Sequence, residues 1–192
     1  TYKKIRLSNN VLTILGLLRK KPGRHPYYNL NTDPKRLAFV LSRYKFSAKM
    51  ACNNRDVLEL GCSEGIGAPT LSEFASSYTG IDLDGSAIKT ANDNFSNPKC
   101  RFLEDDFLGK RYGTFDSIIS LDVIEHISRK YEHLFFKTIS ANLGEDGICI
   151  VGTPNITSDQ YASKASKAGH INLYNAERLS DAMGTVFNNV FV

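Results

Sequence analysis

Residues 57–71 read VLELGCSEGIGAPTL, and this stretch passes from an apolar run through a glycine-rich turn into a helix-like pattern. Gly61, Gly65 and Gly67 lie in the turn. Glycine allows positive φ and lets a ligand approach the backbone, and the first turn of a helix has unpaired N–H groups. The spacing G-x-x-x-G-x-G differs from the dinucleotide fingerprint and from the phosphate-binding loop, and no lysine follows. The pattern argues against nucleotide phosphate binding and leaves two interpretations, a ligand-binding turn or a plain tight turn.

Short apolar runs and helix-like patterns alternate on either side of this turn. The predicted strands are 56–60, 77–82, 100–104, 115–121 and 147–153, and the predicted helices are 34–50, 66–76, 86–95 and 128–142. Strands that are apolar on both faces and alternate with helices indicate a parallel sheet covered by helices. Right-handed crossovers make this an α/β, Rossmann-like, doubly wound sheet, whose ligands bind at the carboxyl ends of the strands.

Length and charge divide the chain into a basic arm at 1–33 and one domain at 34–192. Residues 1–32 contain seven lysines and arginines and no acid, whereas the other 160 residues hold 17 basic and 20 acidic residues. The acidic balance of the domain argues against nucleic acid as a partner. The arm also contains VLTILGLL at 11–18. It is a membrane-surface contact, a partner-binding segment, a lid over the ligand site or a solvated extension. No apolar run is long enough to cross a bilayer, and four cysteines without a C-x-x-C pair indicate a reducing cytoplasm.

Acidic residues cluster at the expected carboxyl ends of the strands. Asp82 follows Gly61 by 21 residues and ends the second strand, where a carboxylate can accept both ribose hydroxyls of a nucleoside. Asp105 or Asp106, after the third strand, is placed to meet an adenine amino group, unless both lie in a solvated loop. Together with Glu59 and Asp122, these acids suit a positively charged ligand and would repel a pyrophosphate.

These motifs together resemble the class I S-adenosylmethionine-dependent methyltransferases, in the order LELGCSEG, TGIDLD, RFLEDDF and FDSIISLDVIEHI between residues 56 and 153. The resemblance implies that S-adenosyl-L-methionine is the cofactor. Ser63 stands where the family usually has glycine. The implied cofactor-binding residues are Arg43, Glu59, Gly61, Ser63, Gly65, Gly67, Asp82, Leu83, Asp105, Asp106 and Leu121. Among them, Arg43 is expected at the methionine carboxylate and the Leu121 carbonyl at the ammonium.

The segment SLDVIEHI places acids and a histidine just past the fourth strand. If it forms a helical turn, Asp122 faces Glu125 and His126 at i+3 and i+4. Three interpretations remain: a helix start with favourable acids, a general base at His126, or a divalent metal such as Mg²⁺. The segment resembles the E-x-x-E-H sequence of ubiquinone-biosynthesis O-methyltransferases and, more distantly, small-RNA 2′-O-methyltransferases. The metal ligands implied are Asp122, Glu125, His126 and His170.

The polar stretch 154–174 follows the fifth strand and is a candidate lid or substrate wall. Its candidate contacts to a polyol are Tyr161, His170, Asn172 and Tyr174. The tail predicts a helix at 176–184 and a sixth strand at 186–192, while the seventh strand of the family is missing from this chain.

The predicted function is methyl transfer from S-adenosylmethionine to oxygen of a small molecule or saccharide acceptor, with His126 and His170 as catalytic residues. One alternative is a metal-dependent RNA 2′-O-methyltransferase. Another is a non-catalytic methyltransferase-fold module that binds a partner through the arm.

Overall fold

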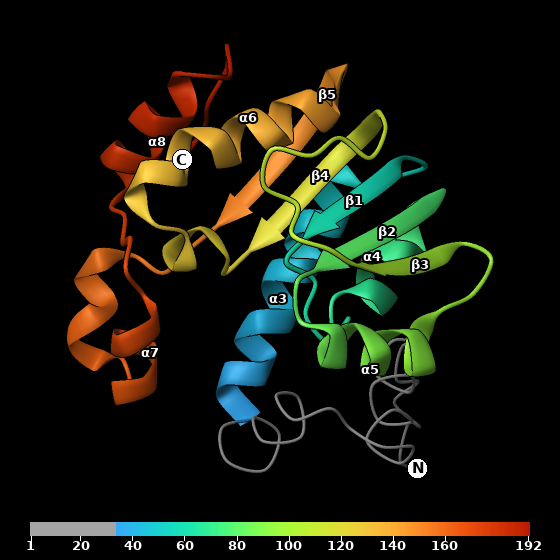
Figure 1. The fold of residues 1–192 in the computed structure, drawn as a ribbon, viewed down its shortest axis with the longest axis horizontal. Helices are drawn as coiled ribbons and strands as arrows, with labels where there is room; N and C mark the ends of the chain where they lie inside the picture. The colour runs from blue at the N-terminus through green and yellow to red at the C-terminus, as the bar shows by residue number, and fades with distance from the viewer. Residues whose placement is uncertain (1–33) are drawn as a thin grey trace, which may run out of the picture.

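Five parallel strands form the centre of the molecule, as the computed structural model of residues 34–192 shows (Figure 1). Their order across the sheet is β3-β2-β1-β4-β5. The strands are β1 (Asp56–Leu60), β2 (Ser77–Asp82), β3 (Cys100–Glu104), β4 (Phe115–Leu121) and β5 (Leu143–Gly152). The order reverses between β1 and β4, so the predicted doubly wound α/β sheet is confirmed. The basic arm at 1–33 lies outside the described residues.

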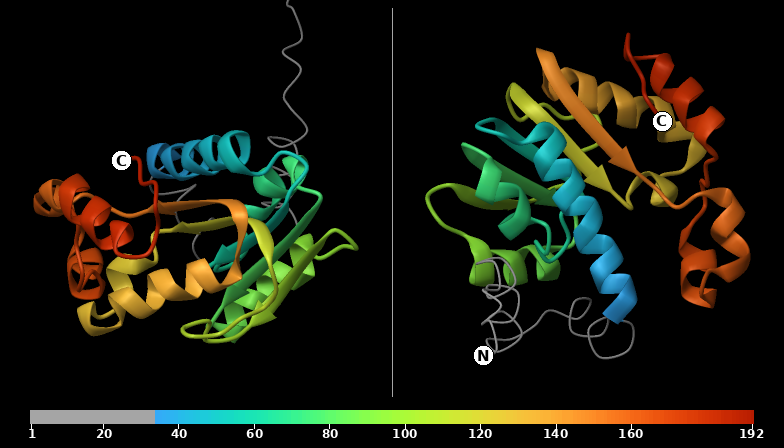
Figure 2. Two further views of the ribbon diagram at one scale, coloured as in Figure 1. Left: turned by 90° about the horizontal axis from the view of Figure 1, so that it is seen from above. Right: turned by 180° about the vertical axis from the view of Figure 1, so that it is seen from behind.

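Helices cover both faces of this sheet (Figure 2). One face packs against α3 (Pro34–Ala51), α4 (Ala68–Phe74) and α5 (Gly85–Phe95), and the other packs against α6 (Glu132–Asn142) and α8 (Ala176–Gly184). Alternate residues along each strand enter the two cores, as with Val57 and Leu58, which are both fully buried. Burial on both faces explains the unbroken apolar runs of the sequence.

Short helices fill the connections at the carboxyl edge. The 3₁₀ turns η1 (Ile124–His126) and η2 (Arg129–Tyr131) follow β4, and η3 (Ile156–Tyr161) and the helix α7 (Lys164–Gly169) follow β5. The lid stretch at 154–174 therefore carries local helical structure. Within residues 34–192, every helix is too short or too polar to cross a bilayer.

The predicted sixth strand at 186–192 is wrong. After α8 the chain turns, with the N–H groups of Val186 and Phe187 both donating to the carbonyl of Met183. Val186 and Phe187 then pack on the core beside α6 instead of pairing with β5. The apolar pattern of this tail reflects partial burial at a turn and no strand, since Phe191 and Val192 at its end are exposed.

Tyr44 of α3 anchors that helix to the middle of the sheet. Its hydroxyl donates to Glu59 of β1 at 2.7 Å, and its ring lies against the backbone of Gly67 at the start of α4. A Cβ on Gly67 would come within 2.1 Å of the Tyr44 ring. Gly67 therefore allows the close packing of α3, α4 and β1.

We predict that Gly67→Ala destabilises the domain by about 1–3 kcal/mol, since the added methyl overpacks a buried contact. Urea unfolding of both proteins measures the difference. Gly184→Ala is the matched control, because nothing lies within 4 Å of a Cβ there. Equal stabilities for Gly67→Ala and the wild type would contradict this packing role.

Candidate functional site

The glycine turn after β1 folds onto the end of β2. Gly61, Ser63 and Gly65 all have positive φ, at 79°, 47° and 74°. The N–H of Ser63 donates to Asp82 Oδ2 at 2.8 Å, and the N–H of Asp84 donates to Oδ1 at 3.0 Å. The expected proximity of the turn and Asp82 is confirmed.

Asp82 keeps hydrogen-bonding capacity beyond these two contacts. A carboxylate offers about four acceptor positions, and two are used. Leu83, next along the chain, exposes 72% of its surface at the same edge. This arrangement fits a group with paired hydroxyls beside an apolar surface.

The two acids after β3 differ in their availability. Asp105 accepts from Lys110 Nζ at 2.5 Å and from the Tyr112 hydroxyl at 2.8 Å, and these bonds lower the pKa of its carboxyl. Asp106 is exposed, and its Oδ1 accepts a hydrogen bond from the N–H of Leu108 at 3.2 Å. Asp106 is therefore the freer of the two candidates for an adenine amino group.

Two predicted cofactor contacts have structural roles. Glu59 is 1% exposed, and its oxygens accept from the hydroxyls of Tyr44 and Tyr78 at 2.7 and 2.5 Å. It therefore lies inside the core and not at an open strand end. Gly67 is buried and meets the Tyr44 ring, so its contact is with protein. Glu59 and Gly67 therefore contact α3 in place of an open ligand site, because the packing of Tyr44 from α3 against them was not visible in the sequence.

Asp122 does not form the predicted helical turn with Glu125 and His126. Its φ is 58°, and η1 begins two residues later. This left-handed turn directs its carboxylate to Arg43, whose Nη1 donates to Oδ1 at 2.6 Å while Nη2 pairs with Oδ2. Arg43, which was predicted to bind the methionine carboxylate, is thus paired with Asp122, which was predicted to bind a metal.

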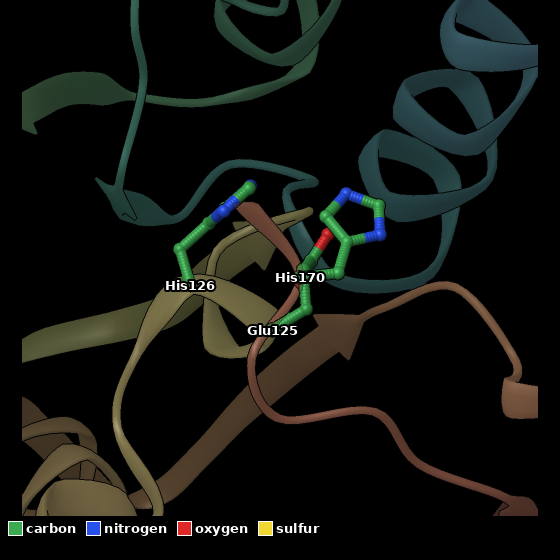
Figure 3. Close-up of side chains that lie close together, drawn as sticks. All are labelled: Glu125, His126 and His170. Carbon is green, nitrogen blue, oxygen red and sulfur yellow. The ribbon is translucent and has the colours of Figure 1, made fainter. Parts of the chain in front are cut away.

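Glu125, His126 and His170 come together at the carboxyl edge (Figure 3). One ligating atom from each lies within 4.8 Å of the other two. The two imidazole rings are edge to face, with centroids 5.1 Å apart. We call these three residues the histidine cluster. It contains three of the four predicted metal ligands.

The protonation states of the histidine cluster suit a cation or a proton acceptor. His126 Nδ1 lies 2.9 Å from the carbonyl of Gly169. A carbonyl only accepts, so Nδ1 carries the proton and Nε2 of the neutral ring has a lone pair. Burial lowers the pKa of His170, and the neighbouring His126 lowers it further. The lowered pKa favours the neutral, ligand-competent form of His170.

Glu125 supplies the strongest sign of a missing partner. Its side chain is fully buried, Oε2 accepts from the Thr153 hydroxyl at 3.0 Å, and Oε1 has no hydrogen-bond partner. Burial raises the pKa of this carboxyl, and the charge of Asp122 adds to the shift. A buried oxygen without a partner costs free energy unless a ligand satisfies it.

Backbone contacts and a polar network hold His170 beside η1. The N–H groups of Ile171 and Asn172 both donate to the carbonyl of Glu125, at 2.8 and 3.1 Å. Behind them, Glu132 Oε2 accepts from Arg178 Nη2 at 2.5 Å and also from the Tyr174 hydroxyl.

This network changes the predicted roles of two lid residues. Asn172 and Tyr174 are 3% and 1% exposed and bond to Glu132 and each other, so they are structural and do not face an acceptor. Tyr161, in contrast, is 84% exposed. Sequence reasoning missed Glu132 and Arg178, because the partners lie 46 positions apart and neither belongs to a recognisable motif.

Known proteins share both the sequence pattern and the fold. The family model described as "Methyltransferase domain" matches residues 23–186. The chain belongs to this methyltransferase domain family. The methyltransferase domain is 28% identical to a mitochondrial ubiquinone biosynthesis O-methyltransferase of Arabidopsis thaliana, over 76% of this chain and 48% of that protein. It is 27% identical to a probable S-adenosylmethionine-dependent methyltransferase of Mycolicibacterium smegmatis, over 70% of this chain and 52% of that protein.

The chain thus spans about half the length of the curated relatives it matches. Among solved structures, the N-methyltransferase NodS of Bradyrhizobium japonicum, in complex with S-adenosyl-L-homocysteine, aligns with a TM-score of 0.65. The alignment covers 90% of this chain and 85% of that one, at 19% identity. This similarity supports the fold of the methyltransferase domain.

Glu59 makes the stability of the methyltransferase domain depend on pH. Burial raises the pKa of this carboxyl from 4.5 to about 7, although the two tyrosine hydroxyls oppose the shift. Between these values the folded protein keeps a proton that the unfolded chain has lost, so this group's contribution to stability falls as pH rises from 4.5 through 7. We predict that Glu59→Gln removes this slope, which is at most about 1.4 kcal/mol per pH unit.

The measurement is the difference in free energy of unfolding between variant and wild type at pH 5, 6, 7 and 8. We expect the free energy of unfolding of the variant to rise relative to that of the wild type up to about pH 7. Above that pH the difference should stay constant. A difference independent of pH would show that Glu59 is already ionised in the folded protein.

Proposed function

We propose that this methyltransferase domain binds S-adenosylmethionine and transfers the methyl group to a hydroxyl of a small molecule or sugar, with a divalent cation held by the histidine cluster. The observation that carries the proposal is the buried, unpartnered Glu125 Oε1 beside the imidazoles of His126 and His170, at the same sheet edge as the glycine turn and Asp82. Relatives named as O-methyltransferases and S-adenosylmethionine-dependent methyltransferases support it.

The residues at the ends of β1, β2 and β3 fit the cofactor. The glycine turn is bent by three positive φ values, Asp82 retains acceptor capacity for ribose hydroxyls, and Asp106 is accessible for the adenine amino group. The carbonyl of Leu121 at the end of β4 is the proposed acceptor for the ammonium. Bound there, S-adenosylmethionine supplies an electrophilic methyl on a sulfonium.

The histidine cluster fits a divalent cation with an open coordination position. Three protein ligands plus one free position are typical of catalytic sites. Two imidazoles and one carboxylate suit Mn²⁺, Fe²⁺ or Zn²⁺ better than Mg²⁺, which prefers oxygen ligands. A cation held there would supply the charge that lowers the pKa of an acceptor hydroxyl.

The chain's own groups then position the acceptor. The Gly169 carbonyl holds the proton on His126 Nδ1, so Nε2 is the ligand while the cation is bound; without a cation, the same Nε2 is the proposed proton acceptor. His170 stays in place through the Ile171 and Asn172 contacts to Glu125. Transfer neutralises opposite charges, so fixed geometry and exclusion of water contribute most of the rate.

Charge and local structure favour a small acceptor. In the lid stretch, the exposed Tyr161 of η3 offers one aromatic ring with a hydroxyl. The domain outside the arm has more acidic than basic residues, which opposes long contacts with phosphates. A phenol or sugar hydroxyl therefore fits better than an RNA ribose.

We predict one S-adenosylmethionine site by isothermal titration, weakened about 10- to 100-fold in Asp82→Ala because the ribose hydroxyls lose a charged acceptor. Asp93→Ala, at an exposed ion pair on α5, should bind like the wild type. Failure of the wild type to bind S-adenosylmethionine would refute the proposed function, and unchanged affinity in Asp82→Ala would refute the ribose assignment.

We further predict that Glu125→Gln weakens Mn²⁺ binding at least tenfold, roughly the cost of disturbing a metal site, and spares binding of S-adenosylhomocysteine.

His126→Ala should lower methyl transfer to a catechol or sugar by about 100-fold or more. Activity that survives dialysis against EDTA would rule out the cation and leave only the acid–base role of His126.

A further inference from the structure

The ion pair between Arg43 and Asp122 connects two groups that the proposed function assigns to different ligands. Arg43 is expected at the carboxylate of the cofactor, and Asp122 follows β4 just before the histidine cluster. Here each terminal guanidinium nitrogen of Arg43 contacts one carboxylate oxygen of Asp122. While this pair persists, the arginine neutralises Asp122.

Several features indicate that the pair is built to open. The side chains of Arg43 and Asp122 remain 23% and 40% exposed, so solvent and a competing carboxylate can reach the pair. Arg43 Nε is buried and has no hydrogen-bond partner, so Asp122 alone does not satisfy the guanidinium. Asp122 also holds a φ of 58°, which costs free energy for a residue with a Cβ.

Asp122 lies within electrostatic range of the histidine cluster. Its charge raises the pKa of both Glu125 and His170. Asp122, and to a smaller extent Glu125, raise the pKa of the Arg43 guanidinium. A change in the pairing of Arg43 therefore changes the negative charge that the cluster experiences.

We propose that Arg43 and Asp122 couple the cofactor and cation sites: the cofactor's carboxylate takes Arg43 from Asp122, and the released Asp122 strengthens cation binding by the histidine cluster. This inference rests on the proposed function. Because coupling between two binding sites is reciprocal, a bound cation strengthens cofactor binding by the same factor. The cation is then held tightly only when the methyl donor is present.

The test is titration of the full 192-residue chain with Mn²⁺, followed by electron paramagnetic resonance, with no nucleoside, S-adenosylhomocysteine or 5′-methylthioadenosine. S-adenosylhomocysteine has the amino-acid carboxylate and no sulfonium charge. 5′-Methylthioadenosine has the same nucleoside and thioether and no carboxylate. We expect S-adenosylhomocysteine to tighten Mn²⁺ binding about tenfold, a typical coupling between sites, and 5′-methylthioadenosine to leave it unchanged.

Variants separate the two partners. Arg43→Gln should bind Mn²⁺ tightly without any nucleoside and show no further response, because Asp122 is already free. Asp122→Asn should retain weak Mn²⁺ binding and also lose the response. Asp93→Asn removes an exposed pair with Lys89 on α5 and should respond like the wild type.

The outcomes distinguish this coupling from the proposed function. If the wild type binds S-adenosylhomocysteine and Mn²⁺ independently, or if 5′-methylthioadenosine tightens Mn²⁺ equally, the coupling is wrong and the proposed function stands. If the wild type binds neither ligand, the proposed function fails and the coupling fails with it.

Discussion

The carboxyl group of Glu59, buried in the middle of the sheet, connects the core to the edge where ligands bind. It accepts hydrogen bonds from Tyr44 of α3 and Tyr78 of β2, so three elements meet at one group. A buried acid is tolerated because both oxygens have partners. Tyr44 also packs on Gly67 at the start of α4, and its neighbour Arg43 pairs with Asp122. The position of α3 therefore governs both the glycine turn and the charge beside the histidine cluster.

Parallel strands explain why residues far apart in the sequence share this edge. Every crossover returns the chain to the opposite end, so the strand ends that carry Gly61, Asp82 and Leu121 lie side by side. The last part of the site needs an additional contact, since His170 lies in the lid stretch after β5. The carbonyl of Glu125 provides it by accepting from Ile171 and Asn172.

Local patterns in the sequence were sufficient for the sheet and the glycine turn. The doubly wound parallel sheet and the meeting of the glycine turn with Asp82 follow from apolar runs, glycine spacing and the geometry of parallel strands. The Arg43–Asp122 pair was not predictable, because it joins positions 79 apart and depends on a left-handed residue that the sequence does not mark. Glu59 looked like an acid at a strand end, since periodicity does not distinguish a strand's open tip from its buried interior.

The placement of negative charge at the carboxyl edge suits a sulfonium donor in a specific way. Methyl transfer removes the positive charge of the donor, so a carboxylate that pairs directly with that charge stabilises the ground state more than the transition state and slows the reaction. Asp82 and Asp106 lie at and just past the ends of β2 and β3, and their proposed partners are the neutral hydroxyl and amino groups of the nucleoside. Asp122, nearer to the fourth strand, pairs with Arg43 while no donor is bound. Under the proposed coupling, the charge of the released Asp122 then meets the cation of the histidine cluster rather than the sulfonium, so affinity for the donor does not raise the barrier to transfer.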